Sequence, residues 1–265
     1  MTVDIDPIMR DTKLDEICQK KGYLIDMDSV IYNGSRLLPG AEELLAFLVE
    51  HKKEYLLLTN NSARTPRELQ YKFQRLGLNI HADHFFTSGQ ASAFYLQSEK
   101  KAEGGTVYVI GEPGLCLSLY EKGFYMNDHN PDYVVLGETP NYNFEKITKA
   151  IQLVQQGATL IATNLDLASA DRHGHTVPCT GAFVACIESV TQKKAFSCGK
   201  PNGLMLQYAQ STLGLDPSDT CVIGIEHPLD PGVVVSVGNQ PSIVLDTVLE
   251  ISQKSQKKTV ISLDK

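Results

Sequence analysis

The sequence lacks the features of a membrane-spanning, secreted or disulfide-stabilised chain. Its 265 residues contain no apolar run near the ~20 residues that a membrane helix needs. Residues 1–21 carry scattered acids and no apolar core segment, so we expect no secretory signal there. The six cysteines form no CxxC pair, which is typical of reduced thiols in a cytoplasmic protein.

Basic residues are scarce relative to acidic ones. The chain has 24 Lys and Arg against 31 Asp and Glu, for a net charge of −7. Because nucleic-acid binding relies on clustered Lys and Arg, this balance disfavours a nucleic-acid partner. Two nucleotide-binding motifs are missing as well. No GxGxxG follows the first strand-like run, and Pro201 after Gly199-Lys200 takes the place of the Ser or Thr of a P-loop.

The sequence does contain a regular alternation of short apolar runs and amphipathic segments. Strands that alternate with helices of roughly 10 to 15 residues favour βαβ units and a mainly parallel sheet. Thr65 and Glu68 have the spacing of a capping box, which predicts a helix start there. The strand patterns include 22–26, 54–60, 106–111, 132–138, 158–164 and 219–224, and the helix patterns include 41–53, 65–77 and 144–156.

Polar residues stand where three of the strand-like runs end. Asp26 and Asp28 follow the first run, Thr59 and Asn60 end the second, and Lys200 ends a later one. Ligands of open parallel sheets bind beyond the carboxyl ends of the strands, so we expect these side chains to meet in one crevice. Paired carboxylates suit a hard cation, and a lysine suits phosphate oxygens. Two acids after a strand can also simply cap the next turn.

The order and spacing of these residues resemble a known family. Asp26-Met27-Asp28, Thr59-Asn60-Asn61 and Lys200-Pro201 look like the first three motifs of the haloacid dehalogenase superfamily. Segments such as "LPGAEELL", "LLLTNNS", "LGETPNYNFEKI" and "IATNLD" are similar to its NagD-like branch of sugar and nucleotide phosphatases. The resemblance runs from about Gly22 to about Gly224, which is most of the chain.

The resemblance implies an α/β fold with a Rossmann-like parallel-sheet core and an inserted α/β cap of the C2 type. The expected domains are residues 1–87 as the first part of the core, 88–194 as the cap and 195–265 as the second part of the core. Similar proteins often pair through the cap, so a homodimer is a possible assembly. The implied substrate is a small phosphorylated metabolite in the cytoplasm.

The resemblance also implies roles for the site residues. Asp26 would attack phosphorus and form an aspartyl-phosphate. Asp28 would protonate the leaving oxygen and then take a proton from the water that hydrolyses the intermediate. Thr59 and Lys200 would hold phosphate oxygens, with Asn60 as a further phosphate-binding candidate. Mg²⁺ is the implied cofactor, held by the Asp26 carboxylate and the main-chain carbonyl of Asp28.

A polar loop in the expected cap, "NLDLASADRHGHTVPCTG", faces the active site in similar proteins. His173 and His175 in this loop are candidates for contact with the leaving group. A solvent-exposed loop with two ordinary histidines is the alternative. A zinc site of His173, His175 and Cys179 lacks a convincing fourth ligand.

The fourth motif departs from the family pattern. The family places an aspartate directly after the strand-end glycine, where this chain has Ile225. Glu226 is displaced by one residue, and Asp230 matches the second acidic position, so both are candidate metal ligands. Losing one anionic ligand would weaken the metal site. The alternative function is therefore that of a catalytically impaired protein on the same fold, which binds phosphometabolites or has a regulatory role. The following "VVVSV" favours strand over the helix that the family expects.

Overall fold

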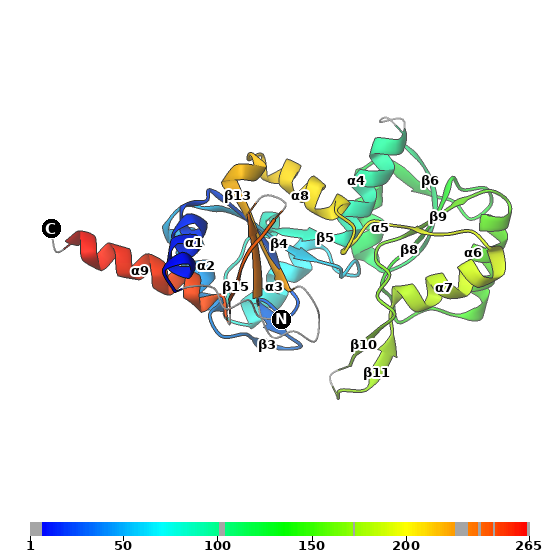
Figure 1. Ribbon diagram of the computed structural model, residues 1–265. Helices are drawn as coiled ribbons and strands as arrows, with labels where there is room; N and C mark the ends of the chain where they lie inside the picture. The colour runs from blue at the N-terminus through cyan, green and yellow to red at the C-terminus, as the bar shows by residue number, and fades with distance from the viewer. Residues whose placement is uncertain are drawn as a thin grey trace. The chain divides into compact units, whose positions relative to one another are not determined.

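The chain folds into two compact α/β units. The structure, a computed structural model, describes residues 7–100, 104–171, 173–225, 233–237, 240–245 and 247–263 (Figure 1). The first unit contains the chain up to Leu58, Phe73–Ile80 and the chain from Ala209, and the second contains Thr59–Lys72 and His81–Tyr208. The α/β fold class is therefore confirmed, while the cap boundaries at residues 88 and 194 stay a prediction.

The sheet of the first unit is built around a strand that is buried on both faces. Its strands lie in the order β15 (Gln240–Leu245), β14 (Val233–Val237), β13 (Thr220–Ile225), β1 (Gly22–Asp26), β4 (Glu54–Thr59) and β5 (Phe85–Thr87). β1 runs parallel to both neighbours, and its residues 22–25 are buried, as expected for a central apolar strand. β14 and β15 run antiparallel, so the preference of "VVVSV" for a strand is confirmed.

The sheet of the second unit is entirely parallel. Its strands lie in the order β12 (Phe196–Ser197), β9 (Thr159–Ala162), β8 (Tyr133–Leu136), β6 (Gly105–Ile110) and β7 (Phe124–Met126). Successive residues of a strand face opposite sides, so β8 sends Val135 into one apolar cluster and Val134 into another. The first cluster includes residues of α4 (Ser88–Lys100) and α5 (Pro113–Glu121), and the second includes residues of α6 (Phe144–Gln155) and α7 (Thr180–Thr191).

A β-hairpin of the second unit stands apart from its sheet. β10 (Ala168–Ala170) pairs antiparallel with β11 (Thr176–Pro178), and Figure 1 shows this yellow-green hairpin projecting from the unit. The sequence predicts only a polar loop here. The strands escape prediction because each is three residues long and almost wholly exposed, so neither shows an apolar alternation.

The two ends of the described chain lie together in the first unit. α1 (Pro7–Gln19) and α9 (Leu249–Leu263) are joined by ion pairs between Arg10 and Glu250 at 2.7 Å and between Lys254 and Asp15 at 3.2 Å. Neither helix follows from the sequence patterns above. Across the described ranges, no helix combines the length and apolar character needed to cross a membrane.

The remaining elements connect these parts. They are β2 (Tyr32–Asn33), β3 (Arg36–Leu37), α2 (Ala41–Glu50), α3 (Pro66–Arg75) and α8 (Leu204–Leu213), with short 3₁₀ turns at Ala82–His84 and Pro217–Asp219. The helix patterns predicted at 41–53, 65–77 and 144–156 are confirmed as α2, α3 and α6.

Candidate active site

Asp26 and Asp28 stand at the carboxyl end of β1. Asp26 is the last residue of the strand and pairs with Leu58 of β4, and the Met27 amide donates to the Leu58 carbonyl at 2.9 Å. Asp26 is half-buried and Asp28 is exposed, so both carboxylates lie where buried strand gives way to a turn. Thr59 is the last residue of β4 and directly follows Leu58 in the chain.

The turn that carries Asp28 places the next residue in a backbone conformation that favours glycine. Ser29 has a φ of 63°, in the left-handed region that glycine enters most easily. Its amide donates to the Tyr32 carbonyl at 2.9 Å, which holds the turn in this form. A serine is tolerated here at a conformational cost of roughly 1 kcal/mol.

The residues after Thr59 build a rigid loop. Thr59 is fully buried, and its hydroxyl accepts a hydrogen bond from the Asn61 amide at 3.1 Å. The Asn61 side chain in turn accepts hydrogen bonds from the amides of Ala63, at 3.1 Å, and Arg64, at 3.3 Å. The Asn61 side chain thus bonds the loop that follows it.

Asn60 connects this loop to Lys200, 140 residues further along the chain. Its Oδ1 accepts from the Lys200 amide at 2.8 Å, and its Nδ2 donates to the Lys200 carbonyl at 3.0 Å. The same Nδ2 lies 3.1 Å from Oδ2 of Asp166, while the Asn60 carbonyl accepts from Ser88 and Asn164. Both ends of the Asn60 amide are therefore occupied by protein groups.

The loop around Lys200 owes its shape to its neighbours in sequence. A Cβ on Gly199 would lie 2.3 Å from the Thr163 carbonyl oxygen and 2.7 Å from Oδ1 of Asn60, so only glycine fits there. Asn202 donates to the Ser197 carbonyl at 2.6 Å and accepts from the Leu204 amide, where α8 begins. In "GKPN", glycine and asparagine thus support the lysine between them.

The fourth motif lies on β13, beside β1. A Cβ on Gly224 would approach the Cβ of Asp26 at 3.9 Å, so the end of β13 is level with the candidate nucleophile. Ile225 follows as the last residue of the strand and pairs antiparallel with Val233 of β14. Glu226 and Asp230, the other candidate metal ligands, lie outside the described residues.

His173 and His175 lie at the exposed turn of the β10–β11 hairpin. Their main-chain amides donate to one Asp171 carboxylate oxygen at 2.8 and 2.9 Å. The pKa of Asp171 is lowered chiefly because the His175 amide donates to it, with a smaller contribution from the His173 amide. Among the described residues, no three His, Cys, Asp or Glu side chains group in a way that could hold a metal ion.

Two site components escape prediction from sequence. Asp166 contacts Asn60, and Ser62 accepts a hydrogen bond from the Glu138 amide at 2.9 Å and another from the Thr163 hydroxyl. The only signals are the place of Asp166 in "IATNLD" and that of Ser62 in "LLLTNNS". The joining of Asn60 to Lys200 is observed, while the meeting of Asp26 and Asp28 with Lys200 stays a prediction.

Comparison with known proteins agrees with this fold and these motifs. The family model for haloacid dehalogenase-like hydrolases matches residues 23–125. The chain is 41% identical over 202 residues to a dihydroxyacetone phosphatase of Corynebacterium glutamicum, covering 76% of this chain and 72% of that protein. It is 32% identical over 244 residues to the ribonucleotide monophosphatase NagD of Escherichia coli, covering 92% of each chain.

Solved structures give the same result. NagD of E. coli aligns with a TM-score of 0.71 at 33% identity, covering 78% of this chain and 80% of that one. A 4-nitrophenylphosphatase of Thermotoga maritima aligns with a TM-score of 0.78 at 26% identity, covering 91% and 98%. The chain therefore belongs to the haloacid dehalogenase-like hydrolases, in their NagD-like phosphatase branch. Its enzyme class is that of the phosphoric monoester hydrolases.

Proposed function

We propose that this protein hydrolyses small phosphate monoesters, with Mg²⁺, through an aspartyl-phosphate formed on Asp26. The observation that carries the proposal is the hydrogen bonding of Asn60 to both main-chain groups of Lys200. This bonding fixes the lysine loop to the residue after Thr59, and Thr59 itself follows the β1 partner Leu58. The candidate hydroxyl and ammonium thus belong to one hydrogen-bonded framework of the second unit, and in the proposed reaction Asp26 attacks the phosphorus that this framework holds.

Each residue has a distinct part in the reaction. The Asp26 carboxylate attacks phosphorus while Asp28 gives its proton to the departing oxygen. Asp28, now a carboxylate, then takes a proton from the water that attacks the phosphorus of the aspartyl-phosphate, which frees Asp26 and inorganic phosphate. Thr59 and Lys200 hold the other phosphate oxygens and offset the charge that develops on them. Asn60 positions Lys200.

The donor atoms at the end of β1 fit Mg²⁺ as proteins usually bind it. Mg²⁺ takes one or two carboxylates and completes its shell with water and substrate phosphate. The half-buried Asp26 carboxylate and the main-chain carbonyl of Asp28 supply two such oxygens, and Glu226 and Asp230 are the further candidates. When bound, the ion offsets phosphate charge and polarises phosphorus.

The named relatives support a small metabolite as substrate. Their names give dihydroxyacetone phosphate and ribonucleoside monophosphates as substrates. A substrate from the same range of sizes, in a cytoplasmic setting, fits this chain. The six free cysteines suit that reducing compartment. A homodimer formed through the cap is part of the same proposal.

A second candidate function is binding of phosphometabolites with little turnover. Ile225 favours it, because this strand-end position offers no oxygen to a cation and its backbone continues the β13–β14 ladder. In that case the framework of Asn60 and Lys200 would hold phosphate, while the weakened cation site would limit the chemistry.

Hydrolysis of p-nitrophenyl phosphate separates the two functions. We expect turnover that requires Mg²⁺, is lost on chelation, and falls on the order of 10²-fold or more in Asp26→Asn. An inactive parent whose activity appears in Ile225→Asp would instead support the binding protein with a decayed metal site. Metal-independent turnover that survives Asp26→Asn would contradict the proposed mechanism.

A further inference from the structure

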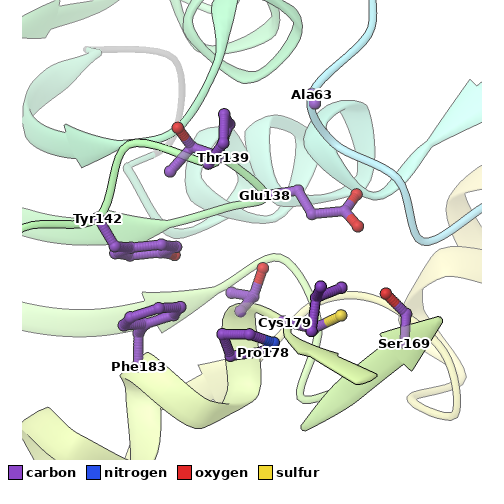
Figure 2. Close-up of a pocket in the computed structure, with 11 residues that line it drawn as sticks. Ala63, Glu138, Thr139, Tyr142, Ser169, Pro178, Cys179 and Phe183 are labelled. Atoms are coloured by element: carbon purple, nitrogen blue, oxygen red, sulfur yellow. The ribbon is translucent and has the colours of Figure 1, made fainter. Parts of the chain in front are cut away.

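The second unit contains a pocket that the catalytic residues do not occupy. Its volume is about 500 Å³, and it opens between the segment after β8 and the segment that joins β11 to α7 (Figure 2). A cavity of this size is in the range of small-molecule sites. Ala63, four residues after Thr59, lines it as well.

One end of the pocket is apolar. The Tyr142 and Phe183 rings stack with their centroids 3.7 Å apart and their planes within 9° of each other. The Tyr142 hydroxyl donates to the Gly137 carbonyl at 2.8 Å, so that polar group serves the protein and the ring face forms a wall. Pro178 adds to the same apolar surface.

The other end of the pocket is polar and carries a negative charge. Figure 2 shows the Glu138 carboxylate, the Ser169 hydroxyl and the Cys179 thiol on the side away from the Tyr142–Phe183 pair. Burial raises the pKa of Cys179, a hydrogen bond with Ser169 opposes that shift, and the charge of Glu138 adds to it. The Glu138 carboxylate is thus the acidic group at this end of the pocket.

Both sides of the pocket are hydrogen-bonded to the loop that follows Thr59. On one side, the Glu138 amide donates to the Ser62 hydroxyl at 2.9 Å. On the other, the Gly181 amide donates to the Asp166 carbonyl at 2.9 Å, and the Asp166 side chain contacts Asn60. The pocket is thus built onto the residues that hold Lys200.

We propose that this pocket receives the leaving group of the phosphate ester, and that Glu138 selects neutral, hydroxyl-bearing leaving groups over anionic ones. The inference rests on the proposed function. The Glu138 carboxylate accepts hydrogen bonds from alcohol groups and repels a carboxylate or second phosphate brought into the same partly desolvated space. Such like-charge repulsion is a common source of specificity. Ser169 offers a further polar contact, and the Tyr142–Phe183 pair covers the carbon skeleton.

Two esters of the same carbon skeleton test this selectivity. Glycerol 3-phosphate ends in a hydroxymethyl group where 3-phosphoglycerate carries a carboxylate. We expect the parent to prefer glycerol 3-phosphate in kcat/KM. Glu138→Gln should raise kcat/KM for 3-phosphoglycerate on the order of tenfold or more, while Glu138→Asp, which keeps the charge, retains the parent preference.

Controls separate this inference from the proposed function. Glu145→Gln removes one negative charge from an exposed position of the same unit and should leave the preference unchanged. Turnover of p-nitrophenyl phosphate by each variant reports on folding and on the catalytic residues. If no ester turns over, the proposed function fails, and the ratio of dissociation constants for the two phosphates decides the inference instead. Equal preference in the parent and in Glu138→Gln, or no binding of either ester, would overturn it.

Discussion

Asn60 is the residue on which the candidate site most depends. Its amide bonds the amide and carbonyl of Lys200 and reaches Asp166, so three separate segments meet at one side chain. Sequence alone offers Asn60 as a phosphate ligand, since it lies beside Thr59 at a strand end. In the structure its side chain bonds Lys200 and Asp166, which are more than 100 positions away, and no local pattern reveals these contacts.

Replacing Asn60 should therefore disturb Lys200 without removing it. In Asn60→Ala the Lys200 amide loses its acceptor at 2.8 Å, and we expect KM to rise and kcat/KM to fall on the order of tenfold or more. Steady-state kinetics and thermal unfolding measure the two effects. The matched control is Asn143→Ala, which removes the N-cap of α6 in the same unit and costs about 1 kcal/mol of stability. A similar kinetic loss in the control would show that Asn60 acts through stability alone.

Among the elements, those with strong local signals are predictable and those built from short exposed pieces are not. α3 begins at Pro66, directly after Thr65, and the predicted capping box forms there. The Thr65 amide donates to the Glu68 carboxylate at 2.7 Å, and the Glu68 amide donates to the Thr65 hydroxyl at 3.2 Å. β7, β10 and β11 have three residues each, too few to establish a period. β14 follows from its β-branched composition, although the family expects a helix there.

The capping box gives α3 a pH-dependent stability. Hydrogen bonds from the Thr65 amide and hydroxyl lower the pKa of Glu68, so this contribution is present above the unfolded-state pKa near 4.3 and is lost as pH falls through the folded value. Thr65→Ala should cost about 0.5–2 kcal/mol at pH 7 and less at pH 3. Denaturant unfolding at both pH values measures the difference. Thr12→Ala, an exposed helical threonine without a carboxylate partner, should show no such pH dependence.

At the scale of the molecule, the sequence predicts the order of the motifs along the chain but not the contacts that their residues make. Asp26 and Leu58 pair because β1 and β4 are neighbouring buried strands, which the apolar runs predict. The hydrogen bonding of Asn60 to Lys200 and the pocket lined by Glu138 depend instead on loops that are distant in sequence and come together in the fold. The divergence at Ile225 is visible in the sequence, and the structure adds that this residue extends β13 into an antiparallel pair with β14.

The central claim is that Asp26 carries the phosphoryl group between substrate and water. Asp28→Asn tests it, because p-nitrophenolate leaves with little help from an acid, while attack by water still needs a base, so the intermediate should accumulate. The measurement is mass spectrometry of peptides from the acid-quenched variant after mixing with p-nitrophenyl phosphate and Mg²⁺. We predict one phosphoryl group on the peptide that contains Asp26. Release of p-nitrophenol with no phosphoryl group on that peptide, or with the group on another residue, would contradict the account.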